Sequence, residues 1–461
     1  MRTPPTFMRT CVFLVPIFLI VGCGSNSVNP SNILHGKAPE TVDVSGTDKG
    51  TSTASATPTN VPAASVTQPQ PSDVPATTTN APATSVTQPQ PSDVPATAGN
   101  VIQIDPSMSQ SQIQSKIDES QTGDTIAFAA GTYNLASNGS NPNGAALNLG
   151  AGRTYTGPSS ESLAHFVGTG GYPLMYFAGT TITIKYFLFD NGLLFLENGV
   201  TSATVDNNTF ENIDCGVNAS QTSAIFVAGG LNNSDISYNT FQNIGQTCNS
   251  QYQDSQGAGG VTLYAFHNLT ITHNVFNTVY EGIDVPDSGG GGYDGAGGHF
   301  NYNTFTGIHR IAIELLGTST NPSGLEVAFN NYSNALNPWA YTFGLSLTDG
   351  QNMIVHDNVL NGNNNQPGYV PYAVEIAGHN SSAYNNTLEG YWGWGFAIGA
   401  SAVDGISIHD NTICGPAMSA ASASGSNPVP GNANGFISWE TNAGTGTFTG
   451  NMTSSALTCS R

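Results

Sequence analysis

A short pattern recurs along most of this chain: an alternating strand, an asparagine, and then an aromatic or aliphatic residue. The stretch Leu269–Val285, LTITHNVFNTVYEGIDV, shows the pattern in full. Its copies align one asparagine in a column, formed by Asn208, Asn239, Asn274, Asn303, Asn330, Asn358, Asn386, Asn411 and Asn451. Self-similarity at roughly 25–40 residues per unit indicates a repeat protein, in which each unit packs on its neighbours.

The composition favours strands and limits the possible partners. The 461 residues include 54 glycines, and only 8% of residues are charged. Strong helix formers are sparse, while Gly, Asn, Thr and Ser abound, so long helices are not expected. Lysine and arginine total 9 against 30 aspartates and glutamates, a net charge of −21. Such a surface repels nucleic acid and polyanionic glycans, so no nucleic-acid partner is expected.

Residues 1–22 have the features of an export signal. Two arginines precede a short apolar run that ends in Ile20-Val21-Gly22-Cys23. This end resembles the lipobox of bacterial lipoproteins, in which the signal is cut before a cysteine that is then lipidated. The resemblance implies a lipid anchor at Cys23. Gly24, standing where aspartate favours inner-membrane retention, implies an outer-membrane lipoprotein that faces the periplasm or the cell surface. An ordinary signal peptide or anchor with a chance cysteine is the alternative.

Residues 23–100 are predicted to be a disordered linker. The sequence SVTQPQPSDVPAT occurs at Ser65–Thr77 and again at Ser85–Thr97. Pro, Thr, Ser and Ala dominate, and such a segment cannot bury enough apolar surface to fold. Its prolines make it a stiffened tether. We therefore place one folded domain at residues 101–461.

Four cysteines of the predicted domain stand in matched places of neighbouring units. Cys215 and Cys248 each follow a ladder asparagine, and so do Cys414 and Cys459. An even count at matched places in an exported protein suggests two bridges, Cys215–Cys248 and Cys414–Cys459. Free buried thiols are the alternative.

The start of the domain predicts a short helix and then a strand. Ile113 and Ile117 are spaced for one apolar helical stripe, Gly123-Asp124 breaks the helix, and Thr125–Phe128 alternates. A short helix, a G-D-T-I strand and a G-T-Y turn resemble the opening of pectate-lyase-like right-handed parallel β-helix proteins. The resemblance implies an all-β solenoid whose N-terminal helix covers the open end of the core. This superfold hosts lyases, hydrolases, epimerases, esterases and adhesins, so the resemblance alone does not assign an activity.

In that family each coil has three strands, and the asparagine ladder lies between the second and third. The phenylalanines after the ladder, such as Phe276, should then stack in the core. The first strands are Gly192–Leu196, Ala224–Val227, Gly260–Leu263, Gly282–Val285, Ala312–Leu315, Gly344–Leu347, Ala373–Ile376, Gly395–Ile398 and Gly435–Ser438. Residues between their inward-facing pairs must face out. That outward column is Leu194, Phe226, Thr262, Asp284, Glu314, Ser346, Glu375 and Ala397.

Three carboxylates in this column are candidate catalytic groups: Asp284, Glu314 and Glu375. Stacked coils are about 4.8 Å apart, and like charges this close raise at least one pKa. The result is a protonated acid beside an ionised carboxylate, as glycoside hydrolysis requires. We therefore expect hydrolysis of a neutral or weakly charged polysaccharide. The alternative is that these acids are solvated surface or a cation site.

Cationic and calcium-binding candidates lie beside these acids. Arg310 and the adjacent His309 could bind substrate or tune the carboxylates, or Arg310 could form a structural ion pair with Glu281 or Glu314. No cofactor is expected otherwise. A weaker candidate is a Ca²⁺ site formed by Asp284, Asp287 and Asp294 with backbone carbonyls, although their spacing matches neither an EF-hand nor a nonapeptide calcium pattern.

Aromatic residues in the connections before the first strands are candidate sugar-binding groups, because aromatic faces stack on sugar rings. With Glu281, the candidate substrate-binding residues of this side are Tyr280, Trp339, Tyr341, Tyr372, Trp392 and Trp394. His273, His356 and His409 recur just before ladder asparagines and suggest a surface stripe.

Two other functions remain open. A polysaccharide lyase or epimerase would act on a uronate glycan with Ca²⁺ or a basic residue, and Arg310 is the only obvious base on this face. A glycan-binding or adhesin-like surface scaffold would use the same groove without cutting. In each case the expected partners are a polysaccharide and, through the lipid anchor, a membrane; we expect a monomer.

Overall fold

The computed structural model describes most of the predicted domain. The described residues are 99–214, 222–245, 259–286, 295–316, 323–335, 343–348, 350–362, 372–390, 392, 394–398, 404–415, 426–428, 437–440, 446–456 and 458–459. By its contacts the chain divides into residues 1–93 and residues 94–461. The predicted export signal, the lipidation site Cys23 and the linker up to residue 98 lie outside the described residues.

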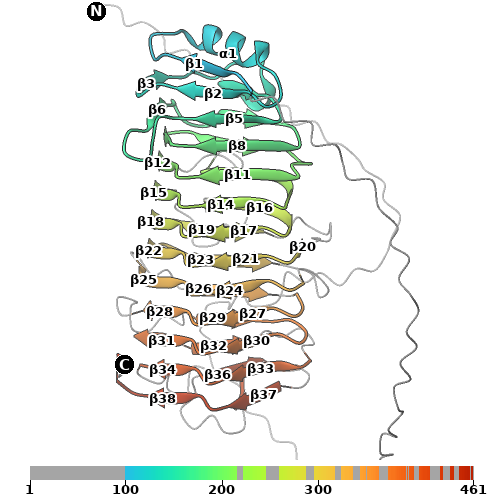
Figure 1. Cartoon of the computed structure of the whole chain (residues 1–461). Coiled ribbons are helices and arrows are strands. Elements are labelled where there is room, and N and C mark those ends of the chain that lie inside the picture. The colour runs from blue at the N-terminus through green and yellow to red at the C-terminus, as the bar shows by residue number, and fades with distance from the viewer. Residues whose placement is uncertain are drawn as a thin grey trace, which may run out of the picture. The chain divides into compact units, whose positions relative to one another are not determined.

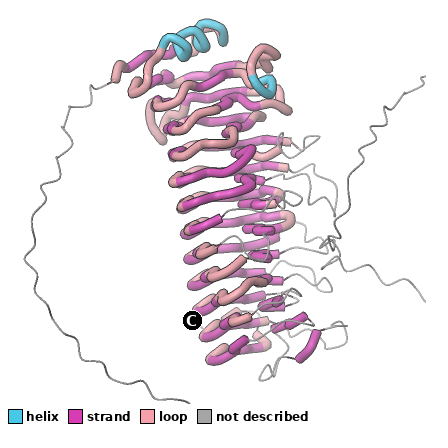
Figure 2. Tube along the Cα trace, turned by 90° about the vertical axis from the view of Figure 1, so that its right-hand side faces the viewer, coloured by secondary structure: helices cyan, strands magenta, loops and turns pink. Residues whose placement is uncertain are grey.

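One α-helix covers the N-terminal end of the domain (Figures 1 and 2). Helix α1 spans Gln110–Glu119, with Ser109 as its N-cap and Gln112 completing a capping box. Such a box satisfies backbone N–H groups that the first helical turn leaves free. Ile113 and Ile117 are buried against the first coils. The predicted capping helix is therefore confirmed, including its apolar stripe.

The rest of the domain is a right-handed parallel β-helix with three sheets, here called sheets 1, 2 and 3 after the order of strands in a coil. Sheet 1 contains β4 (Leu147–Leu149), β7 (Pro173–Phe177), β10 (Leu193–Leu196), β13 (Ile225–Asn232), β16 (Gly259–His267), β19 (Glu281–Val285), β23 (Ile311–Leu316), β26 (Phe343–Thr348), β29 (Tyr372–Ile376), β32 (Trp394–Ile398), β36 (Ile437–Glu440) and β35 (Ser426–Pro428), while β20 (Gly295–Ala296) pairs with β16.

Sheets 2 and 3 complete each coil. Sheet 2 contains β1 (Val101–Ile104), β2 (Thr125–Phe128), β5 (Arg153–Thr156), β8 (Thr181–Lys185), β11 (Ser202–Asp206), β14 (Asp235–Ser237), β17 (Thr270–Thr272), β21 (His299–Asn301), β24 (Glu326–Ala328), β27 (Ile354–His356), β30 (Ser382–Tyr384), β33 (Ile406–His409) and β37 (Gly446–Thr449). Sheet 3 contains β3 (Gly131–Asn134), β6 (Ala164–Val167), β9 (Phe187–Asp190), β12 (Thr209–Ile213), β15 (Thr240–Ile244), β18 (Val275–Val279), β22 (Thr304–Ile308), β25 (Asn331–Ala335), β28 (Val359–Gly362), β31 (Thr387–Gly390), β34 (Thr412–Cys414) and β38 (Met452–Ser454). A 3₁₀ turn, η2, spans Pro142–Gly144.

The predicted asparagine ladder lies in the turn between sheets 2 and 3. The side-chain nitrogen of Asn274 donates to the Ile236 carbonyl at 2.9 Å and to Asn303 Oδ1 at 3.1 Å. Its own Oδ1 accepts from the backbone N–H of Asn239 at 2.9 Å. The same pattern runs from Asn208 to Asn451. Each asparagine thereby satisfies backbone groups that the bend would otherwise leave without partners.

The predicted phenylalanine column fills the core behind this ladder. Neighbouring rings are stacked nearly parallel, with 4.7 Å between the centroids of Phe241 and Phe276 and 4.8 Å between those of Phe276 and Phe305. All are fully buried. Tyr332 continues the column, and its buried hydroxyl has no hydrogen-bond partner among the described residues. The column is therefore structural, as the repeat pattern predicted.

A stripe of aromatic rings follows the ladder on the outside, where the sequence predicted a histidine stripe. It runs through Tyr238, His273, Tyr302, Phe329, His356, Tyr384 and His409, with neighbouring ring centroids 4.8–5.4 Å apart. His356 lies between two carboxylates, with Nε2 3.1 Å from Glu326 Oε1 and Nδ1 2.7 Å from Asp357 Oδ2. Burial lowers the pKa of His356, but these two hydrogen bonds raise it more, so the net shift is upward.

Of the two predicted disulfides, Cys414–Cys459 is present. It ties the C-terminal segment to β34. Cys215–Cys248 lies outside the described residues and stays a prediction. Within the described part of the chain, no helix is long and apolar enough to cross a membrane.

Candidate functional site

The outer face of sheet 1 carries the predicted column of acids. Thr262 pairs with Asp284, Asp284 with Glu314, Glu314 with Ser346, and Ser346 with Glu375 in the strand register. Asp284 and Glu314 are therefore neighbours on adjacent coils, and Glu314 and Glu375 stand two coils apart, as predicted.

One member of the predicted column is wrong. Leu194 pairs with Ile225 and lies in the main core, whereas Phe195 pairs with Phe226 on the outer face. The register shift between β10 and β7 leaves the extra residue, Leu174, in β7. β10 itself alternates regularly, with Leu194 and Leu196 in the main core and Leu193 and Phe195 in the outer cluster, so the outward column was placed one residue too early in this strand.

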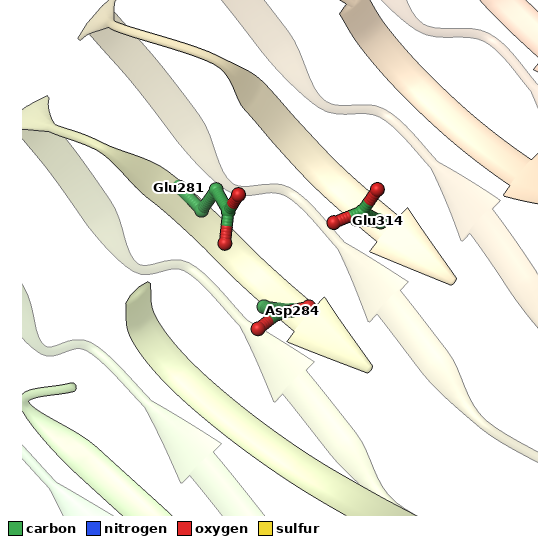
Figure 3. A group of neighbouring side chains, drawn as sticks. All are labelled: Glu281, Asp284 and Glu314. Atoms are coloured by element: carbon green, nitrogen blue, oxygen red, sulfur yellow. The ribbon is translucent and has the colours of Figure 1, made fainter. Parts of the chain in front are cut away.

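Glu281 joins Asp284 on the outer face because the strand alternation is interrupted between them. A Cβ atom added to Gly282 would lie 2.5 Å from the Phe305 ring, so Gly282 faces the core, as does Ile283. Two consecutive inward residues leave Glu281 and Asp284 on the same side. Figure 3 shows their carboxyl groups beside that of Glu314 from the next strand. One carboxylate oxygen from each of the three lies within 4.8 Å of the others.

These acids are buried and not solvated, which excludes the alternative of an open acidic surface. Glu281 and Asp284 are each 1% exposed, and Glu314 is 3% exposed. Arg310 is the counter-ion of two of them: its Nη1 contacts Glu281 Oε1 and lies 2.9 Å from Glu314 Oε2, while Nη2 lies 3.2 Å from Glu314 Oε1. The arginine therefore binds Glu314 through two parallel hydrogen bonds, the geometry that best matches a guanidinium to a carboxylate.

Asp284 is the exception within this cluster. Both of its buried carboxylate oxygens lack a hydrogen-bond partner among the described residues. Burial raises the pKa of Asp284 well above its usual range, and the Glu281 and Glu314 carboxylates raise it further; Arg310 and the nearby Thr262 hydroxyl only partly oppose this rise. Asp284 therefore retains a proton at pH values where an ordinary aspartate is ionised.

Two further predicted residues take different roles around the cluster. The Ser346 hydroxyl donates to Glu375 Oε2 at 2.6 Å, so Glu375 is hydrogen-bonded on the far side of Glu314. His309 is buried next to Arg310, and burial lowers the pKa of its imidazole. Its Nε2 has no partner within the described part of the chain. A neutral imidazole with a free nitrogen can accept a proton or bind a hydroxyl group.

The predicted aromatic residues divide between the outer face and the core. Tyr372 and Trp394 are paired in register on sheet 1, and the Tyr372 ring lies 5.1 Å from that of Phe343. Tyr280 is buried at the corner that precedes Glu281. Trp392 instead packs within the main core and donates to the Leu360 carbonyl at 3.3 Å. Trp339, Tyr341, Asp287 and Asp294 lie outside the described residues.

An aromatic cluster on the N-terminal half of the same face was not predicted as a site. Tyr176, Phe195, Phe226 and Tyr264 follow one another along β7, β10, β13 and β16, with neighbouring centroids 5.2–6.0 Å apart. They form an apolar cluster that is separate from the main core. The pKa of Tyr264 is raised by burial and by the charge of Asp284, which places the two side chains near each other. The signal was present in the sequence as aromatic residues at outward positions of consecutive coils.

Comparison with known proteins yields only distant similarities. No family model matches the chain, and no curated protein sequence matches it. Among solved structures, an alginate lyase from Paenibacillus sp. str. FPU-7 is 13% identical with a TM-score of 0.43, covering 75% of this chain and 99% of that one. A PL6 alginate lyase in complex with a trisaccharide is 11% identical with a TM-score of 0.47, covering 78% and 86%. DFA-IIIase from Arthrobacter chlorophenolicus A6 is 12% identical with a TM-score of 0.39, covering 69% and 96%. Similarity this distant carries no information about the activity of this chain.

Proposed function

We propose that this protein cleaves a glycosidic bond of a neutral or weakly charged polysaccharide, with Asp284 as proton donor and Glu314 as the paired carboxylate. The observation that carries the proposal is the contrast between the two groups. Asp284 is buried without a partner among the described residues and has a raised pKa, whereas Arg310 binds Glu314 in its ionised form. Two carboxyl groups in environments that drive their pKa values apart supply the acid and the base or nucleophile.

The separation of the two groups supports a retaining reaction. Oxygens of Asp284 and Glu314 lie within 4.8 Å of each other. Retaining glycosidases place their carboxyl groups about 5 Å apart, and inverting ones about 6.5–9.5 Å apart. Glu375 stands three coils from Asp284, about 14 Å at 4.8 Å per coil, which is too far for either pairing. We therefore assign Glu375, with Ser346, to substrate binding.

The charge of the site supports the substrate class. Arg310 is already paired with Glu281 and Glu314, so the described site offers no second cation to a uronate carboxylate. The aromatic cluster of Tyr176, Phe195, Phe226 and Tyr264 lies along the same face, where apolar faces of sugar rings could stack. The predicted lipid anchor and linker would hold this domain at an outer membrane.

The test is turnover on a panel of neutral, uronic-acid and amino-sugar polysaccharides. For the responsive substrate, Asp284→Asn and Glu314→Gln should each lower kcat by at least about 100-fold, the usual contribution of acid–base catalysis. Both variants should keep the fold and bind the glycan. Turnover at the wild-type rate in both variants would refute the assignment. Glycan binding without turnover by the wild type would support the scaffold function instead.

A second candidate follows from the three clustered carboxylates. Calcium prefers carboxylate oxygens, and a lyase could use it to bind a uronate substrate. Arg310, however, already holds two of the three acids, so a cation would have to displace it. Calorimetric titration with Ca²⁺, using Glu281→Gln as the control, tests this. Calcium-dependent formation of an unsaturated product would favour the lyase over the hydrolase.

A further inference from the structure

A second cluster of histidine and carboxylate side chains lies on sheet 2, whereas the buried acids lie on sheet 1. It is formed by β21, β24 and β27, which follow one another along the stack (Figure 1). His299 stands opposite Glu326 in the strand register, and Ala328 at the end of β24 stands opposite His356. Three successive coils therefore bring two imidazoles and a carboxylate together.

The Glu326 carboxylate is the centre of this cluster. Its Oε2 lies 2.8 Å from His299 Nδ1, and its Oε1 lies 3.1 Å from His356 Nε2. Asn301 fixes the carboxylate in place: its side-chain amide donates to Glu326 Oε2 at 2.6 Å, and its Oδ1 accepts from the Ala328 N–H at 2.8 Å. One nitrogen from each histidine is therefore directed at a carboxylate that the backbone of the fold holds still.

His356 is oriented from its other side by Asp357. Asp357 Oδ2 lies 2.7 Å from His356 Nδ1, so a neutral imidazole donates its one N–H there and turns the lone pair of Nε2 toward Glu326. A carboxylate that holds one ring nitrogen and aims the other is the usual partner of a metal-binding histidine. A carboxylate oxygen only accepts, so the contact between that lone pair and Glu326 is favourable when a cation lies between them.

We propose that His299, Glu326 and His356 bind a divalent transition-metal ion such as Zn²⁺. Two histidines and one glutamate are a ligand set that Zn²⁺ accepts, and they leave one coordination position for water. The two nitrogens approach opposite oxygens of the carboxylate, so the ion must draw one imidazole toward the other. The His299 side chain is 54% exposed and has room to make this movement. The site departs from the absence of a cofactor that the sequence suggested.

The donor atoms decide which metal this cluster prefers. Imidazole nitrogen suits Zn²⁺, Cu²⁺ and Ni²⁺, whereas Ca²⁺ takes oxygen ligands. The buried acids Glu281, Asp284 and Glu314 offer oxygen alone. The two clusters should therefore separate the two kinds of ion, with the transition metal on sheet 2. The net charge of −21 attracts cations to the surface of this chain and favours their binding.

The test is calorimetric titration of the full chain with ZnCl₂ at neutral pH. Glu326→Gln and His356→Gln should each weaken Zn²⁺ binding at least about tenfold, because even the outer partners of a metal ligand are worth about 10–100-fold in affinity. Binding should also weaken as the pH falls, since the imidazoles must lose their protons to bind the ion. Titration with CaCl₂ should give no heat that either substitution removes.

His409→Gln is the matched control. His409 lies two coils beyond His356 in the same column, and its Nδ1 is 2.9 Å from Asp410 Oδ2, but within the described residues no second carboxylate faces it. This variant should bind Zn²⁺ like the wild type. Equal losses in His409→Gln and His356→Gln would overturn the proposal, and so would binding that only Glu281→Gln removes, which would place the ion at the buried acids. A wild type that binds no Zn²⁺ up to about 1 mM would overturn it too.

Discussion

Replacing Arg310 tests how the buried acids are held. Arg310→Met keeps most of the side-chain volume but removes the counter-ion of Glu281 and Glu314. The arginine side chain is 10% exposed and the side chains of Glu281 and Glu314 are 1% and 4% exposed, so water cannot replace the guanidinium group. Breaking a buried pair by removing one partner costs about 3–5 kcal/mol. A native domain is stable by only about 5–15 kcal/mol, so the loss should be large and readily measured.

The pH dependence of this loss follows from the sign of the pKa changes. Without Arg310, the folded-state pKa values of Glu281 and Glu314 should rise above their unfolded-state values. The penalty is then full above the folded pKa and disappears as the pH falls toward the unfolded pKa, where both acids are neutral in either state. The stability difference from the wild type should therefore shrink at acidic pH. Adding Glu281→Gln should restore part of the stability at neutral pH.

The assay is urea unfolding followed by circular dichroism, with hydrogen exchange of β19 and β23 as a local probe, because a repeat array can unfold in parts. Lys185→Met is the control: its ammonium group is 5.4 Å from the centroid of the Tyr186 ring. This replacement should cost less than about 1 kcal/mol, the usual value of a cation–π contact at an accessible site. A loss below about 1 kcal/mol for Arg310→Met would refute the reasoning.

Three further outcomes follow from the ladder, the core and the aromatic stripe. Asn274→Ala leaves the buried N–H of Asn239 and the carbonyl of Ile236 without partners and should cost about 2–6 kcal/mol in urea unfolding, at about 1–3 kcal/mol for each group. Tyr332→Phe removes a buried hydroxyl that has no partner among the described residues and should leave stability unchanged or raise it by about 1 kcal/mol. The pKa of His356 is raised, so its stabilisation is full below the unfolded pKa and is lost as the pH rises through the folded pKa. His356→Gln should remove that pH dependence, and an NMR titration of the imidazole should give a folded pKa above the ordinary histidine value.

The fold could be predicted because its determinants are local and repeated. The column from Asn208 to Asn451 marks the same turn in nine successive coils, and each copy reinforces the assignment of the others. The capping helix could also be predicted, since Ile113 and Ile117 define its buried face and Gly123-Asp124 breaks it within one short segment. These signals do not depend on contacts between distant parts of the chain.

The site was only partly predictable because it depends on the register of each strand. Alternation placed Asp284, Glu314 and Glu375 on the outer face, as the structure shows. It could not place Trp392, which reaches back into the core from a connection. The burial of the three acids could not be predicted from the sequence either, because outward-facing positions on a sheet are ordinarily solvated. The register of the strands and the burial of the outward-facing acids are set by the assembled coils and not by any one segment.

The sequence also indicates where the alternation of inward and outward side chains is interrupted before each acid. The first strands open with glycine or alanine: Ala224, Gly260, Gly282, Ala312, Gly344 and Ala373. Added Cβ atoms at Gly260 and Gly344 would meet the buried side chains of Phe276 and Leu360 at 2.5–2.8 Å, so these small residues face the core together with the larger residue that follows. Two inward residues in a row then put the residue before the pair outside. In the coil of Gly282 that residue is Glu281, which raises the pKa of Asp284, as Glu314 does, and shares Arg310 with Glu314. The small residue at the start of this strand therefore places Glu281 on the outer face, where it forms a cluster with the stacked acids Asp284 and Glu314.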